Sequence, residues 1–268
     1  MFLETLPKTR SRFFPLRLAL TALFLLILVG IARFAWYPGL LLQLSGTARH
    51  LIVVVVAALV IGPGLSTLLY RPGKRGLLLD LVVVLVVEIA AITVVASDLY
   101  QRRPYFAVFA VDRFQLLAAN EVDWGDIRYS ELRSKPFGGP RLVYAKLPED
   151  PSAIAALIDE IVLGGGVDID RRPELWLPYP EGVQSVRERL ISLDMASGGA
   201  TAVEAWLKSD ALDAADFGYL PLRGRVADAS IVIDRSSGSP IKMLDFDPWQ
   251  ELPPQDHQPT RDIEQAHQ

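Results

Sequence analysis

The side chains that most often carry catalysis are scarce in this sequence. It contains no cysteine, which excludes thiol nucleophiles, thiolate zinc sites and disulfide scaffolds. Its three histidines are His50, His257 and His267, and the last two lie within the final twelve residues. A Ser-His-Asp triad needs a positioned imidazole, so we expect no triad here.

Carboxylates are plentiful, but their spacing singles out no catalytic pair. Asp168-Ile-Asp170 and Asp245-Phe-Asp247 offer hard oxygen ligands for a cation, yet no twelve-residue calcium-loop pattern surrounds either one. Gly164-Gly165-Gly166 lacks the strand and helix context of a nucleotide-binding loop and is better interpreted as a helix stop. We therefore expect a protein that is not an enzyme and that holds no metal and no cofactor.

One acidic residue stands out because of its apolar surroundings. Glu88 lies near the middle of a long hydrophobic stretch, and Asp80 lies near the start of that stretch. An acid at the centre of a bilayer costs about 2.5–3.5 kcal/mol on insertion scales, so it usually faces other helices or a polar path. Three interpretations of Glu88 stay open. It is a structural group (protonated or paired with Arg33), a docking point for a partner's transmembrane segment, or a proton relay.

Three stretches of about 20 mostly apolar residues are long enough to cross roughly 30 Å of hydrocarbon. They cover about 16–37, 51–70 and 77–96, and together they predict a three-helix membrane domain over 16–96. The first stretch is interpreted as an uncleaved helix, because it is long for a signal peptide and is followed by a poor cleavage site. Pro63, between two glycines in the second stretch, predicts a kink, because proline removes a backbone donor.

The net charge changes sign after the third stretch. Residues 1–96 carry a formal charge of +6, whereas residues 97–268 carry −10. This acidic part argues against nucleic-acid binding, which needs a basic surface to neutralise phosphates. Lysine and arginine gather before the first span and in the loop 71–76, so the positive-inside rule places both in the cytoplasm. Residues 1–15 are then a cytoplasmic N-terminus, and the chain after the third span is extracytoplasmic.

The predicted fold is three N-terminal transmembrane α-helices followed by an α+β extracytoplasmic domain, over 97–250, with a mainly antiparallel sheet. Aromatic and β-branched residues with near alternation predict a buried strand within 103–114, and further strands are expected at 141–146 and 219–225. The turn residues 236–239 predict a hairpin over 229–246. Helical spacing covers 150–161, 181–194 and 200–208. The polar, proline-rich tail 251–268 is expected to be disordered.

The order of these elements, together with several short motifs, resembles the TfpX/TfpZ family of type IV pilin accessory proteins. The likeness covers nearly the whole chain up to Glu251. The matching residues are the run Arg103-Pro104-Tyr-Phe-Ala-Val-Phe-Ala-Val-Asp112-Arg113-Phe114, then Gly138-Gly139-Pro140, Leu177-Pro-Tyr-Pro180 and the closing Asp245-Phe-Asp247-Pro248-Trp249.

The resemblance implies a multi-pass protein of the inner membrane of a Gram-negative bacterium, with its C-terminal domain in the periplasm. Such a protein would help a cognate major pilin to reach the pilus in a stabilising, chaperone-like role. We hypothesise that Glu88, Asp80 and the kink at Pro63 engage the pilin's apolar helix, and that the sheet contacts its head through a strand edge. Replacing Glu88 with glutamine should then weaken co-purification of pilin.

Plainer interpretations of the motif residues also stay open. Asp112 and Arg113 would form a local ion pair at the end of a strand, and Trp249 would fill the core. The alternative function is an extracytoplasmic sensor or ligand-binding receptor. This alternative lacks a cytoplasmic output domain, because on this topology only about fifteen N-terminal residues and one short loop lie in the cytoplasm. A membrane hydrolase or transferase lacks a nucleophile-base pair.

Overall fold

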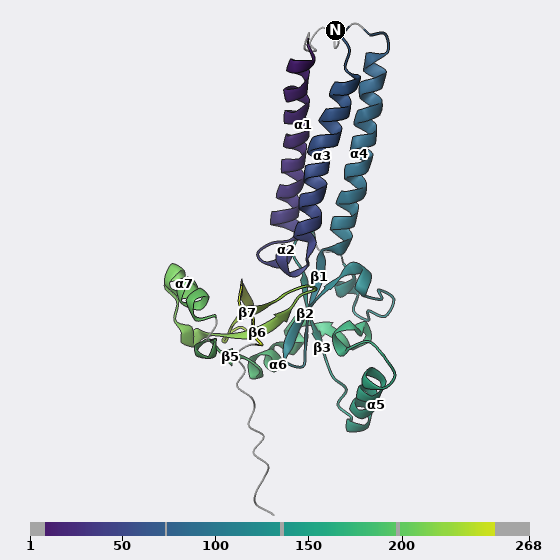
Figure 1. Cartoon of the computed structure of the whole chain (residues 1–268). Helices are drawn as coiled ribbons and strands as arrows, with labels where there is room; N and C mark the ends of the chain where they lie inside the picture. Colours follow the sequence, from purple (N-terminus) through teal and green to yellow (C-terminus); the bar gives the residue numbers. More distant parts are fainter. Residues whose placement is uncertain (1–8, 73, 135–136, 197–198, 250–268) are drawn as a thin grey trace, which may run out of the picture.

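A computed structural model describes residues 9–72, 74–134, 137–196 and 199–249. The tail that was expected to be disordered, together with His257 and His267, lies outside the described residues. Three long apolar helices form a bundle at one end of a sheet domain (Figure 1). They are α1 (Arg10–Ile31), continued by a π-helical turn (Ala32–Trp36), α3 (Thr47–Leu69) and α4 (Leu77–Arg102). All three are long and apolar enough to cross a membrane.

The bundle is a layer in which α3 lies between α1 and α4 (Figure 1). Helix α4 is the least covered of the three, with 6% of the residues in its most apolar stretch buried, against 22% in the other two. Helix α3 runs without a break through Pro63, and the Thr67 hydroxyl donates to the Pro63 carbonyl at 2.7 Å. The kink at Pro63 stays a prediction.

The second part of the chain is built on one mixed, mostly antiparallel sheet, as predicted. Its strand order is β4-β3-β1-β2-β6-β7-β8, and β5 also pairs with β6. Only the β1–β3 and β2–β6 pairs are parallel among the described strands. The strands are β1 (Pro104–Ala110), β2 (Arg113–Ala118), β3 (Arg141–Ala145), β4 (Trp176–Pro178), β5 (Ile191–Ser192), β6 (Phe217–Arg223), β7 (Asp228–Asp234) and β8 (Pro240–Leu244).

The run 103–114 was predicted to contain one buried strand, but it folds as a hairpin. Strand β1 ends at Ala110, and β2 begins at Arg113 and pairs back antiparallel. The tight turn places Val111 at φ 59°, a left-handed conformation that is rare for a β-branched residue. The prediction missed this turn because neither Val111 nor Asp112 is followed by the glycine that marks a two-residue hairpin loop.

Two of the three predicted helices are confirmed and one is too long. Helix α5 (Pro151–Val162) begins after Asp150, whose carboxylate accepts from the Ser152 amide at 3.1 Å as an N-cap. Helix α7 spans Ala200–Asp210. The helix predicted over 181–194 is only α6 (Val183–Glu188), because the residues after it form β5 and pair with β6. Short 3₁₀ turns cover Ala119–Glu121, Ser130–Arg133, Ile169–Arg171, Pro173–Leu175, Tyr179–Gly182, Leu193–Met195 and Ala214–Asp216.

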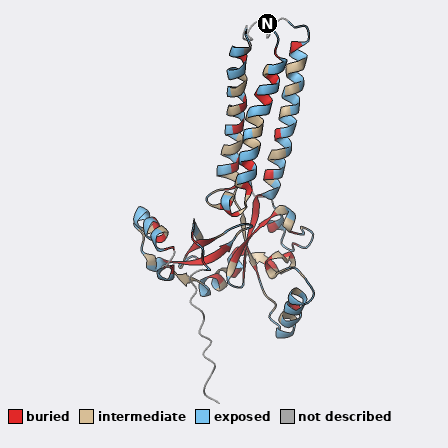
Figure 2. Cartoon of the chain, viewed as in Figure 1, coloured by how far each residue is buried: buried red, intermediate tan, exposed pale blue. Residues whose placement is uncertain are grey.

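Strand β1 is buried on both faces and separates two hydrophobic clusters (Figure 2). The even-numbered residues, such as Phe106 and Val108, pack with Trp176 on one side. Ala107 and Phe109 pack on the other side with residues of β6 and β7. The alternation predicted for this strand is confirmed as far as Ala110.

The connection between α1 and α3 ties the bundle to the sheet. The short helix α2 (Leu41–Leu44) and Tyr37 before it are buried in the same cluster as Phe109. The Tyr37 hydroxyl donates to the carbonyl of Leu99 in α4 at 2.7 Å. Two amides of the loop after β6 donate to the Leu44 carbonyl. The bundle and the sheet therefore share one core.

Candidate functional site

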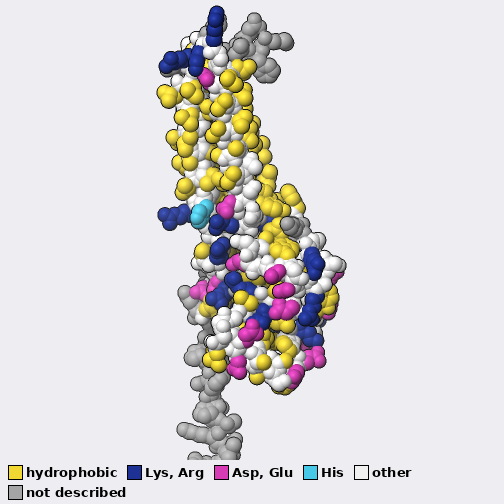
Figure 3. Space-filling view, turned by 90° about the vertical axis from the view of Figure 1, so that its right-hand side faces the viewer, with side chains coloured by type: hydrophobic (Ala, Val, Ile, Leu, Met, Phe, Trp, Pro, Cys, Tyr) yellow, Lys and Arg dark blue, Asp and Glu magenta, His cyan; other side chains and the backbone are white. Residues whose placement is uncertain are grey.

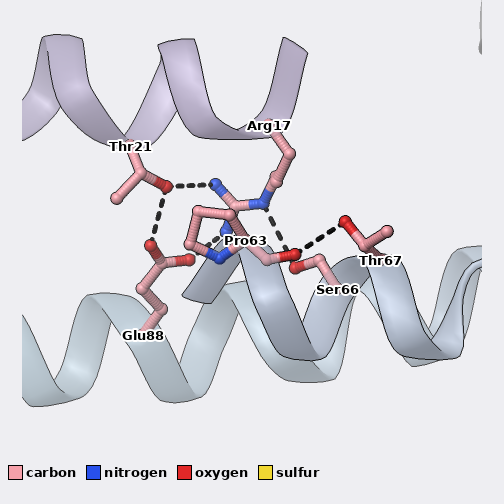
Figure 4. A network of polar contacts seen from close by, with 6 residues as sticks. All are labelled: Arg17, Thr21, Pro63, Ser66, Thr67 and Glu88. Carbon is pink, nitrogen blue, oxygen red and sulfur yellow. Dashed lines mark hydrogen bonds and ion pairs between the residues drawn. The ribbon is translucent and has the colours of Figure 1, made fainter. Parts of the chain in front are cut away.

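A cluster of polar side chains joins all three apolar helices (Figure 4). Arg17 of α1 forms an ion pair with Glu88 of α4, and the pair is largely buried, with 13% and 9% of the side chains exposed. The guanidinium also donates to the hydroxyls of Thr21 at 3.0 Å and of Ser66 in α3 at 3.3 Å. The Thr21 hydroxyl in turn donates to Glu88 at 2.9 Å. The Glu88 charge is thus balanced inside the bundle.

Gly62 of α3 lets the Glu88 side chain of α4 reach across α3 to Arg17 of α1. A Cβ atom built on this residue would overlap the Glu88 carboxylate, so the carboxylate passes directly over the backbone of α3. Any larger residue at this position would push Glu88 away from Arg17. Gly62, beside Pro63, thus leaves room for the Glu88 side chain.

The predicted pairing of Glu88 with Arg33 is wrong. Helix α1 begins at Arg10, earlier than predicted, so Arg33 lies 23 residues along α1 whereas Glu88 lies 11 residues along α4. At ~1.5 Å per residue, Arg33 is about 18 Å further along the bundle. Arg17 lies 7 residues along α1, a mismatch of about 6 Å that its long side chain spans. Arg33 lies instead near the ring of Phe34.

Beside the polar cluster, α3 and α4 form an apolar groove of about 380 Å³. It runs from Val54 to Leu65 along α3, or about 16 Å. Glu88 is the one charged residue among the described residues that line it, and its carboxylate is turned toward Arg17. The lining residues are Val54, Ala57, Ala58, Ile61, Gly62 and Leu65 of α3, and Val83, Val84, Val87, Glu88, Ala91, Ile92 and Val95 of α4.

The two other residues predicted to dock a partner helix lie apart from Glu88 in different settings. Asp80 forms an ion pair with Lys74, and both side chains are partly exposed where α4 begins. Pro63 is buried next to Gly62 on the side of α3 that faces the polar cluster (Figure 4). The structure therefore brings Pro63 close to Glu88 but leaves Asp80 about two turns of α4 away.

The motif at the start of the sheet domain forms its junction with the bundle. Arg103 follows α4 directly and is fully buried. Its guanidinium carbon lies 4.2 Å from the ring centroids of both Tyr100 and Tyr105, and Nη1 donates to the carbonyls of Phe137 at 2.8 Å and Gly138 at 3.2 Å. Cation–π contacts gain strength when they are desolvated, and charge-assisted hydrogen bonds are stronger than neutral ones.

The remaining motif residues serve this junction and the first hairpin. Pro104 begins β1, and Phe114 is fully buried against Phe109. Arg113 contacts Asp112 at 3.3 Å and also Asp168 at 3.5 Å, so the predicted local ion pair is present with a second acceptor. A Cβ atom built on Gly139 would lie 3.3 Å from Pro38. The segment Gly139-Pro140 is therefore packed against the end of α1.

Trp249 of the closing motif does not fill the core, in contrast to the plainer interpretation, whereas Phe246 of the same motif is buried. Trp249 keeps 39% of its surface exposed, and its indole N–H donates to the Asp228 carboxylate at 2.7 Å. Asp247 accepts from the Trp249 amide at 2.9 Å, so Asp247-Pro248-Trp249 forms a turn. This turn fastens the chain to the start of β7.

The sheet domain also contains a polar cavity of about 290 Å³ between β2, β6 and the segment 168–171. Asp170 lines it, although only 5% of this residue is exposed. Burial raises the pKa of its carboxyl group, helped by the charge of Asp168, and Oδ1 has no hydrogen-bond partner within the described part of the chain. Arg171 and Arg223 supply positive charge to the same cavity.

Sequence reasoning found Glu88 but missed its partners. Arg17 was interpreted only as part of a basic flank, and Thr21 and Ser66 were not singled out. A usable signal was present, because Arg17 and Thr21 are four residues apart and therefore share one face of an apolar helix. Such residues usually turn toward other helices when the rest of the surface is apolar.

Comparison with known proteins gives two relatives from Dichelobacter nodosus. The chain is 22% identical over 166 residues to the "Fimbrial assembly protein, serogroup I", an alignment that covers 60% of this chain and 64% of that protein. It is 22% identical over 221 residues to the "Fimbrial assembly protein, serogroup E1", covering 79% of this chain and 85% of that protein. The chain thus spans slightly less than two thirds of the serogroup I protein.

No family model matches the chain, and no solved structure matches it. The two relatives support a group of proteins related to fimbrial assembly. The narrower resemblance to the TfpX/TfpZ family stays a prediction.

Proposed function

We propose that this protein is a non-enzymatic accessory protein of type IV fimbrial assembly, which binds the apolar helix of a cognate pilin in the groove between α3 and α4. The names of the two relatives support a role in fimbrial assembly. The proposed binding mode rests on the groove itself, which is apolar and about 16 Å long. One of its walls is α4, the least covered helix of the bundle.

The groove suits a helix better than a small polar ligand. Ala57, Ala58 and Gly62 lie at i, i+1 and i+5 on α3, and Ala91 faces them from α4. Small residues let helix backbones approach closely, which is the main route to helix association in a bilayer. Because Glu88 is already paired with Arg17, the groove presents no free charge that an apolar helix would have to neutralise.

The location follows from the charge distribution. In our proposal the bundle spans the bacterial inner membrane, with the basic end of α1 and the loop 71–76 in the cytoplasm. The sheet domain then lies in the periplasm, on the same side as the head of a pilin that awaits assembly. Strand β8, at the edge of the sheet, offers a surface for that head.

Filling the groove tests this function. We expect Ala91→Leu to reduce pilin co-purification about fivefold or more, because overpacking costs about 1–3 kcal/mol and 1.4 kcal/mol corresponds to a factor of ten. The measurement is the amount of pilin recovered with the tagged, full-length protein from cells that express both.

Ala90→Leu is the matched control. Ala90 is the preceding residue of α4 and is exposed, but it does not line the groove. The control should recover as much pilin as the wild type. If both variants recover pilin equally, the groove is not the binding site.

A second candidate function is a ligand-binding receptor, which the polar cavity around Asp170 favours. A cavity that contains both arginines and carboxylates suits a small ligand carrying both charges. Native mass spectrometry of the intact protein would detect a retained ligand. The protein would be released from its membrane mimetic under non-denaturing conditions. A protein that is free of small molecules and still binds pilin would exclude this candidate.

A further inference from the structure

We infer that Phe137 is a membrane anchor of the sheet domain, inserted into the lipid interface at the end of the bundle. This inference is independent of pilin, because its partner is the bilayer surface. It concerns a loop residue outside the three apolar helices and outside the groove. The loop is the segment Phe137–Pro140, which precedes β3.

The position of this loop follows from its contacts with the end of α1. A Cβ atom built on Gly138 would lie 3.7 Å from the carbonyl of Ala35, and one on Gly139 would lie 3.3 Å from Pro38. The apolar span that begins at Ser11 ends at Trp36. The loop is therefore level with the last turn of the span, where the hydrocarbon gives way to lipid headgroups.

Phe137 is strongly exposed although it is a large aromatic residue. Its exposed fraction is 71%, so the protein itself does not cover the ring. Figure 3 shows apolar side chains continuing from the bundle across the junction onto the adjacent part of the sheet domain. Aromatic residues concentrate at this depth in membrane proteins, and Trp36 and Tyr100, with ring centroids 5.3 Å apart, lie there too.

Arg103 holds the loop in place. Its guanidinium donates to the carbonyls of Phe137 and Gly138 and contacts the rings of both Tyr100 and Tyr105. The backbone of Phe137 is thus fixed to the end of α4, while its side chain is left outside. Arg103 acts here as a positioning residue, and the anchor would fix the angle between the sheet domain and the bilayer.

A fluorescent label at this position tests the inference. The chain has no cysteine, so Phe137→Cys creates a unique labelling site at an exposed side chain. We would attach nitrobenzoxadiazole to the full-length protein in phosphatidylcholine nanodiscs and measure quenching by lipids with a nitroxide at the headgroup or at mid-chain. We expect a blue-shifted emission and a label depth within roughly 5–10 Å of the headgroup boundary.

Two controls bracket this result. Leu163→Cys labels an apolar residue that is 81% exposed just after α5, at the end of the sheet domain remote from the bundle (Figure 1). This label should show water-like emission without lipid quenching. Val94→Cys labels the outer face of α4 and should be quenched by the mid-chain nitroxide.

Two outcomes would overturn the inference. A Phe137 label that matches the Leu163 label would mean that the ring stays in water. A blue-shifted label that neither nitroxide quenches would mean that protein, from a second copy or another chain, covers Phe137.

Discussion

Replacing Glu88 with glutamine is expected to lower the free energy of unfolding by about 3–5 kcal/mol, because Arg17 then stays buried without its counter-ion. The three helices meet at this ion pair, and the hydroxyls of Thr21 and Ser66 cannot neutralise the remaining charge. The measurement is thermal unfolding of the full-length protein in nanodiscs, followed by tryptophan fluorescence. By comparison, Thr21→Val should cost about 0.6 kcal/mol, the average for a hydrogen bond between membrane helices.

The double variant Arg17→Met, Glu88→Met separates the structural role of Glu88 from a docking role. Removing both charges leaves an apolar contact of similar volume, so most of the lost stability should return. If the double variant regains stability and still recovers pilin, the role of Glu88 is structural. If it is stable but recovers no pilin, Glu88 contacts the partner. An unchanged melting temperature for Glu88→Gln alone would show that the ion pair does not support the bundle.

The second large effect is expected at the junction, where Arg103→Met should destabilise the protein by at least about 3 kcal/mol. The variant loses two ring contacts at 4.2 Å and leaves the carbonyls of Phe137 and Gly138 without their donor. Lysine should not restore stability, because its compact ammonium group cannot contact both rings and donate to both carbonyls with the fixed geometry of a guanidinium. Differential scanning calorimetry on the intact protein would measure the loss.

The preceding residue supplies a matched control for Arg103. Arg102 is exposed and forms an i,i+4 ion pair with Asp98, so Arg102→Met should cost only about 0.3–0.5 kcal/mol. Equal melting temperatures for the two variants would contradict the assigned role of Arg103.

The sequence predicts the parts of this fold that rest on local patterns. Long apolar runs identify the three helices, aromatic and β-branched residues with near alternation identify β1, and the Ser-Ser-Gly-Ser turn between two strand segments identifies the β7–β8 hairpin. Asp150 and Pro151 mark the start of α5 because a cap and a first-turn proline act locally. The extent of α6 was overestimated because Ile191 and Ser192 gain strand pairing with β6, which is distant in sequence.

The site was only half predictable for the same reason. An acid in an apolar helix is visible in one sequence, so Glu88 could be found. Its partner depends on where α1 begins, and a shift of six residues changes the level of every side chain by about 9 Å. The role of Arg103 depends on Phe137 and Gly138, more than thirty residues away, and no local pattern reports such contacts.

The most direct test of the proposed function is a crosslink from within the groove. Val87 and Val86 are consecutive valines of α4 with similar exposure, 62% and 59%, but only Val87 lines the groove. Because the chain has no cysteine, Val87→Cys and Val86→Cys can each be labelled uniquely with a maleimide-benzophenone in native membranes. After irradiation, we predict that pilin is the main product captured from Val87, through its apolar helix, and that Val86 captures little. Capture of pilin equally from both positions, or from neither while a control crosslink succeeds, would contradict the proposal that the groove binds a pilin helix.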